Sequence, residues 1–137
     1  MSISAYHVAM SRHLLVILSV QVSLTCAIAQ DACRDRYRSD LEGNPKSSLA
    51  HFHVAECYFE QKNRVAAVNE YRAALKGDLK PSWIEVWSHI NIGKEFDATG
   101  QRERALNEYR LAEETKDNTR GAQEEVAKYR LSPYRDH

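Results

Sequence analysis

The stretch AVNEYRAA at residues 67–74 returns 38 positions later as ALNEYRLA at residues 105–112. A second echo precedes each copy: HFHVAECY at residues 51–58 corresponds to HINIGKEF at residues 89–96, again 38 positions on. Self-similarity at a fixed spacing of this length is typical of a chain built from repeated supersecondary units. The repeat therefore decides the fold class.

The underlying period is shorter than 38. Tyr37 lies 34 residues before Tyr71, and Val126 lies 34 residues after Ile92. The longer offset therefore contains four extra residues, about one helical turn, which we place near residues 77–84.

Each unit has the pattern of two helices. Apolar residues recur at spacings of three and four, which puts them on one helix face; they include Val54, Ala55 and Tyr58, then Ala67, Val68, Tyr71 and Ala74. Lys62-Asn63 and Thr99-Gly100 can end the first helix of each pair in the left-handed conformation, and Asn44-Pro45 predicts an earlier turn. Ser82 and Glu85 have capping-box spacing. No segment alternates with period two, so we expect an all-α protein without a sheet.

The same positions resemble the tetratricopeptide-repeat (TPR) family, whose first helix carries Trp, Leu-Gly and Tyr and whose second carries Ala, Phe and Ala before Pro. The Leu-Gly positions hold Val54-Ala55, Ile92-Gly93 and Val126-Ala127, followed by the aromatic residues Tyr58 and Phe96. In the second helix the matches are Ala67 and Ala105, then Tyr37, Tyr71 and Tyr109, then Ala74 and Ala112, with Pro45 as a closing proline. The chain departs from the pattern at His51 and His89, which replace Trp, and at Leu79 and Asp117, which replace Pro.

The resemblance covers about residues 31–131 and implies a helix-turn-helix repeat solenoid. Within a TPR domain at residues 30–137, it predicts a half-repeat at 31–44, full repeats at 45–78 and 81–116, and a capping helix at 119–131. Stacked hairpins of this kind complete one another's core. Because its matched positions are packing positions, the pattern is specific for fold and weak for function.

Residues 1–29 differ in composition from the rest of the chain. They contain one charged side chain, Arg12, then the apolar run at residues 14–18, and they end in AIA at residues 27–29. A basic start, a short apolar centre and an A-x-A ending are typical of a secretory signal peptide. We therefore expect cleavage after residue 29 and export to a periplasmic or secreted location, without membrane attachment afterwards. An uncleaved helical anchor and lipidation at Cys26 are the alternatives.

The remaining composition excludes several classes of protein. Of 137 residues, 19 are basic and 19 acidic; removing residues 1–29 leaves 18 basic against 19 acidic, a net charge of −1. A balanced charge gives no reason to expect nucleic-acid binding. With 43% hydrophobic and 9% aromatic residues, the chain can form one modest globular core.

No catalytic motif is present: the sequence has no G-x-S-x-G, no H-E-x-x-H and no phosphate-binding glycine loop. The densest cluster of potential metal ligands is His51, His53, Glu56 and Cys57. His51 and His53 point about 200° apart on a helix, whereas zinc requires three or four converging ligands. We therefore expect no enzyme, no metal and no cofactor, and we interpret His51 and His89 as residues that fill space beside the second helix.

The TPR resemblance implies a concave groove lined by the first helix of each repeat. Helical spacing places on it Phe52, His53, Glu56, Phe59, Trp87, Asn91, Lys94 and Asp97. Aromatic side chains beside mixed charges suit an extended or helical peptide. The leading hypothesis is therefore an exported module that binds a protein or peptide segment. The alternatives are a self-assembling structural subunit of an envelope complex and a small metal-binding protein.

Two cysteines remain after residue 29. Cys33 lies twelve residues before Pro45 and Cys57 twelve residues after it, so in an antiparallel hairpin of helices at 31–42 and 47–61 they have equal heights. An exported protein can form disulfides, so the pair is a disulfide candidate. The alternative is that Cys33 is a free, buried filler at the position that Ala67 and Ala105 occupy in the later units.

Overall fold

The computed structural model describes residues 32–136, and the predicted signal peptide at residues 1–29 lies outside them. The chain divides into two compact units, residues 1–35 and residues 36–137. In the first unit residues 32–35 are described, and they are helical.

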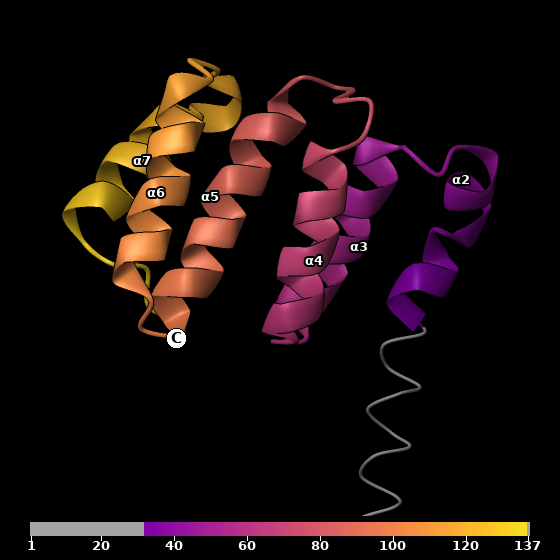
Figure 1. Ribbon diagram of the computed structural model, residues 1–137, viewed down its shortest axis with the longest axis horizontal. Coiled ribbons are helices and arrows are strands. Elements are labelled where there is room, and N and C mark those ends of the chain that lie inside the picture. Colours follow the sequence, from indigo (N-terminus) through magenta and orange to yellow (C-terminus); the bar gives the residue numbers. More distant parts are fainter. Residues whose placement is uncertain (1–31, 137) are drawn as a thin grey trace, which may run out of the picture. The chain divides into compact units, whose positions relative to one another are not determined.

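Helices make up the second unit, and consecutive helices pack in antiparallel pairs (Figure 1). In chain order they are α2 (Arg38–Gly43), α3 (Ser48–Glu60), α4 (Arg64–Leu75), α5 (Trp83–Ala98), α6 (Arg102–Glu114), the 3-10 turn η1 (Thr119–Gly121) and α7 (Ala122–Leu131). No strand occurs between residues 32 and 136. The prediction of an all-α fold is confirmed.

The helix boundaries repeat with the 38-residue offset of the sequence. α3 ends at Glu60 and α5 at Ala98, while α4 begins at Arg64 and α6 at Arg102. Each turn between the two helices of a pair contains a residue with positive φ, Lys62 at 57° and Gly100 at 73°. These are the helix-ending positions expected from the sequence.

Three local expectations need correction. The predicted helix at 31–42 is interrupted at Tyr37, after which α2 runs to Gly43. Ser82 does not cap α5 through its side chain, because its own φ and ψ of −57° and −31° are already helical and a capping residue needs extended angles. The predicted helix at 119–131 opens with a 3-10 turn and becomes α-helical only at Ala122.

Small residues in the first helix let the second helix of each pair approach closely. A Cβ atom added to Gly93 would lie 2.8 Å from both Cδ1 and Cζ of Tyr109, and nearer still to Cε1. Tyr109 is fully buried, and so are Ala55 and Ala105. This close contact between α5 and α6 sets the geometry of the pair.

A histidine–carboxylate contact repeats in both helix pairs. His51 Nδ1 of α3 lies 2.7 Å from Glu70 Oε2 of α4, and His89 Nδ1 of α5 lies 2.7 Å from Glu108 Oε2 of α6. Both histidines therefore contact the second helix of their pair. The 38-residue repeat of the sequence is thus also a repeat of side-chain contacts.

Candidate functional site

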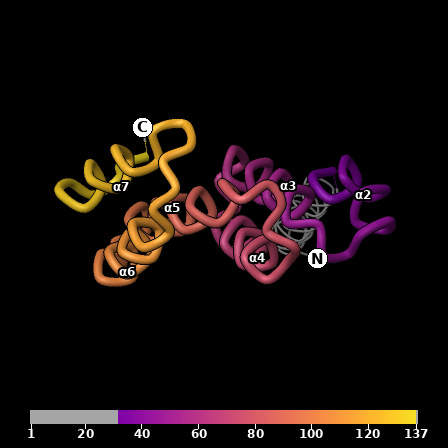
Figure 2. The backbone as a smooth tube through the Cα atoms, turned by 90° about the horizontal axis from the view of Figure 1, so that it is seen from above, coloured from indigo at the N-terminus to yellow at the C-terminus, as the bar shows by residue number. Residues whose placement is uncertain are grey.

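The first helices of successive pairs form one row. α5 contacts both α3 and α7, and Figure 2 places these three helices on one side of the unit, with α4 and α6 on the other. We call the surface that carries Glu56 of α3, Trp87 and Lys94 of α5, and Tyr129 of α7 the first-helix face. It is where the sequence predicted a groove.

The ammonium group of Lys94 lies among three aromatic rings. Its Nζ is 5.8 Å from the ring centroid of Trp87, 5.2 Å from that of Tyr129 and 5.8 Å from that of Tyr134. Burial lowers the pKa of Lys94, an effect that the negative charge of Glu125 opposes, and cation–π attraction also favours the charged form in such a setting. No carboxylate between residues 32 and 136 forms an ion pair with it, since nearby Glu125 pairs with Lys128 instead, at 3.4 Å.

Trp87 joins this cluster to the 3-10 turn η1 that precedes α7. Its indole Nε1 donates a hydrogen bond to the carbonyl oxygen of Thr119, at 3.0 Å. The ring remains partly exposed beside Lys94. A large, oriented and partly exposed aromatic side chain is typical of a binding hot spot.

The segment that follows α7 returns across the first-helix face. The backbone N–H of Tyr134 donates to Oδ2 of Asp97 at 2.9 Å. The Tyr134 ring packs edge-on against Tyr129, with centroids 5.6 Å apart, and lies 6.4 Å from the ring of Phe59. Residues of α3, α5 and α7 thus hold one residue of this segment.

Two residues after Tyr134, Asp136 takes part in a network of ion pairs. Asp136 Oδ2 accepts a hydrogen bond from Arg64 Nη2 at 2.6 Å and lies 3.4 Å from Lys62 Nζ. The hydrogen bond from Arg64 holds the pKa of Asp136 below its usual value. Arg64 Nη1 also donates to Oε2 of Glu95 at 2.8 Å.

Glu95 is itself unusual. It is 2% exposed, and its Oε1 has no hydrogen-bond partner in the described part of the chain. Burial raises its pKa, an effect that the hydrogen bond from Arg64 opposes. The guanidinium of Arg64 is therefore shared between a buried carboxylate and the carboxylate of Asp136.

Two of the predicted groove residues are not available at the surface. Phe52 is 3% exposed, and its ring packs edge-on against Tyr71 and Trp83, at 5.4 and 5.2 Å. It occupies the same repeat position as Ile90, which is fully buried. The side chain at this position faces the neighbouring helices, so Phe52 belongs to the core.

The other buried residue is Asp97, which is 9% exposed. Its carboxylate accepts hydrogen bonds from Arg102 Nη1 at 2.9 and 3.0 Å and from the Tyr109 hydroxyl at 2.9 Å, besides the N–H of Tyr134. Asp97 therefore links α5 to α6 and to the segment after α7.

The remaining predicted residues lie on or beside the first-helix face. His53 stacks on Tyr37 with ring centroids 5.5 Å apart, and its Nδ1 lies 2.9 Å from Glu56 Oε2. Phe59 and Asn91 are partly exposed, as are Trp87 and Lys94. Sequence reasoning missed Tyr129, Arg64 and Tyr134. The signal for Tyr129 was its three-residue spacing from Val126, whereas nothing in the repeat pattern pointed to Tyr134.

The two cysteines of the pair are buried and disulfide-bonded. Their equal spacing from Pro45 predicts that Cys33 and Cys57 are bonded to each other.

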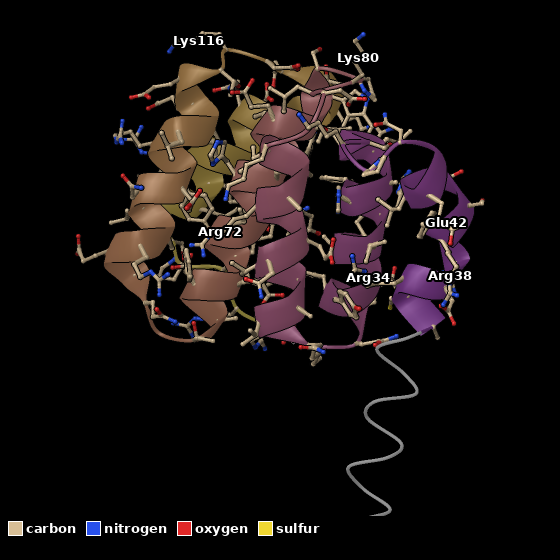
Figure 3. The ribbon with its side chains drawn as sticks, turned by 45° about the vertical axis from the view of Figure 1, so that its right-hand side comes forward. Arg34, Arg38, Glu42, Arg72, Lys80 and Lys116 are labelled. Carbon is tan, nitrogen blue, oxygen red and sulfur yellow. The ribbon has the colours of Figure 1, made fainter. Side chains whose placement is uncertain are left out.

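A hollow of about 220 Å³ lies among α4, α5 and α6, away from the first-helix face. The ring of Phe96 is flanked there by the guanidinium groups of Arg72 at 5.9 Å and Arg104 at 3.9 Å. Arg72 projects from α4 and is labelled in Figure 3. This hollow is the alternative ligand site to the first-helix face.

Between residues 32 and 136 no three side chains of His, Cys, Asp or Glu are grouped as metal ligands. No helix within this range has the length and apolar character needed to span a bilayer. Comparisons with protein families, with curated proteins and with solved structures find no match to this chain.

Proposed function

We propose that this chain is an exported, non-enzymatic interaction module, a TPR-like solenoid that binds a protein or peptide segment on its first-helix face. The observation that carries the proposal is the cluster around Lys94. The ammonium of Lys94 is partly buried, forms no ion pair with the residues between 32 and 136, and lies beside the partly exposed indole of Trp87. Such a group gains most from an incoming acidic ligand.

The repeat architecture supports the solenoid. Helix ends, turn residues and the histidine–glutamate contacts all recur at 38 positions. The spacing of small and aromatic residues resembles that of TPR proteins. A row of parallel first helices offers an extended surface, which is how stacked repeats bind other chains.

The chemistry of the face supports a peptide rather than a small metabolite. Aromatic, acidic and basic groups are spread over α3, α5 and α7 instead of converging in an enclosed pocket. A small-molecule site is normally concave and mostly apolar. Peptide segments are recognised by such distributed anchors.

Export is supported by two features of the chain. Residues 1–29 have the pattern of a secretory signal peptide, and Cys33 and Cys57 are disulfide-bonded. Disulfides persist in oxidising compartments. We therefore place the working protein in the periplasm or outside the cell.

The test is site-specific photo-crosslinking in the native compartment. A photoreactive residue at exposed Glu56 of α3 samples the first-helix face, and one at exposed Glu103 of α6 is the matched control. We expect a protein adduct from position 56 that is absent from position 103 and is lost in Trp87→Ala. Equal adducts from both positions would contradict the proposal, and adducts between copies of this chain would favour self-assembly instead.

A further inference from the structure

We propose that the first-helix face recognises a peptide of the form aromatic–x–acidic, and that Tyr134–Asp136 is an intramolecular copy of that ligand. This inference rests on the proposed function and specifies its ligand. The residues of the chain's own segment define three contacts that an external peptide would reproduce.

The first contact selects an aromatic side chain. Tyr134 lies between Phe59 of α3 and Tyr129 of α7, with Lys94 Nζ 5.8 Å from its ring centroid. Edge-on ring packing and a cation near the ring both favour an aromatic residue over an aliphatic one of equal size.

The second contact is made by the main chain. Asp97 Oδ2 accepts the N–H of Tyr134 while Arg102 and Tyr109 hold the carboxylate in place. A fixed, buried carboxylate oxygen is a strong acceptor for a backbone N–H. This hydrogen bond fixes the register of the bound segment and does not depend on the segment's side chains.

The third contact selects an acid two residues later. Asp136 pairs with Arg64 at 2.6 Å and with Lys62 at 3.4 Å. Side chains two positions apart lie on the same side of an extended chain, whereas the intervening Arg135 is exposed and forms no hydrogen bond or ion pair with the described residues. The face therefore recognises the aromatic and the acidic side chain of the segment, whereas the side chain between them makes no specific contact.

The segment lies at the surface, with Tyr134 partly exposed and Asp136 exposed, so an external peptide can replace it. A hollow of about 320 Å³ separates part of it from α7 and is lined by Lys128, Tyr129, Ser132, Pro133, Tyr134 and Arg135. A tether this short gives the chain's own segment an effective concentration of the order of millimolar. An external ligand must therefore compete, and removing the internal Tyr should strengthen its binding.

The experiment uses the full purified chain labelled with ¹⁵N and the peptide acetyl-Ser-Pro-Tyr-Arg-Asp-amide, titrated to about 2 mM, in the range of that effective concentration. Tyr134→Ala vacates the aromatic site, and Arg135→Ala is the matched control. We expect the peptide to bind Tyr134→Ala about tenfold or more tightly than the unaltered chain, as loss of a well-packed aromatic implies, with shifts at Phe59 and Lys94. Arg135→Ala should bind like the unaltered chain.

Asp136→Ala is a second variant that leaves Tyr134 in place and removes only the pairs with Arg64 and Lys62. It should also bind the peptide more tightly than the unaltered chain, and a peptide with Ala in place of Tyr should bind neither variant. Absence of peptide binding to both variants, or equal binding to the unaltered chain, would overturn the inference. In that case a partner still cross-linked from Glu56 would leave the proposed function standing.

Discussion

Gly93 is the position where the close packing of α5 on α6 can be tested with one methyl group. At an exposed site within a helix, Gly→Ala stabilises by about 1 kcal/mol. Here the new Cβ would lie 2.8 Å from two ring atoms of Tyr109 and nearer still to a third. The ring cannot retreat easily, because its hydroxyl bonds to Asp97 and its face stacks on Tyr129 with centroids 5.8 Å apart.

The magnitude follows from these opposing effects. Overpacking a close-fitting core costs about 1–3 kcal/mol, and the contact with a fully buried, hydrogen-bonded ring places Gly93→Ala toward the upper end. After subtracting about 1 kcal/mol of helix propensity, we expect Gly93→Ala to lower the free energy of unfolding by about 1–2 kcal/mol. Gly43→Ala is the matched control, since its Cβ would meet nothing within 4 Å and the change should be neutral or stabilising.

The assay is urea unfolding followed by far-ultraviolet circular dichroism, with the free energy taken by linear extrapolation. A double-mutant cycle with Tyr109→Leu adds a second readout: with the ring gone, the added methyl should cost less than it does in the native background. A Gly93→Ala chain as stable as the native one, or a midpoint shifted in the same direction as in Gly43→Ala, would contradict close packing at Gly93.

The remaining predictions concern the core, the face and the cysteines. Phe52→Ala should destabilise the fold by about 3–5 kcal/mol in the same urea assay; a change below about 0.5 kcal/mol, typical of surface sites, would return Phe52 to the surface. Trp87→Ala should weaken partner binding by about tenfold or more in a calorimetric titration while helicity is kept, and unchanged affinity would place the site elsewhere. Non-reducing mass spectrometry should find Cys33 linked to Cys57, a bond expected to stabilise by about 3 kcal/mol; two free thiols would contradict the pairing.

The repeat explains why much of the fold was predictable. The two copies of the repeat predict equivalent turns at Lys62 and Gly100, and both residues have the positive φ angles of helix ends. The histidines at 51 and 89 were also predicted to pack beside the second helix. Their contacts with Glu70 and Glu108 depend on tertiary geometry and carry no local signal.

The candidate site was predicted less well for physical reasons. Helical spacing shows which residues share a helix face. It does not show which part of that face the neighbouring helices cover, and Phe52 lies in the covered part. In the sequence, the apolar Ile90 at the same repeat position already indicates that Phe52 belongs to the core. Tyr134 and Asp136 follow the last helix, where periodicity ends, and only the folded chain brings them to Asp97 and Arg64.

Nuclear magnetic resonance can locate directly where a partner segment binds on the first-helix face. The cross-linked partner, or the segment of it that carries the adduct, is added to the ¹⁵N-labelled chain. We expect the Trp87 indole signal and the amide signals of Lys94 and Tyr134 to move on binding, while those of Arg72 and Arg104 stay in place. Shifts confined to Arg72, Phe96 and Arg104 would move the binding site to the hollow among α4, α5 and α6 and contradict the account.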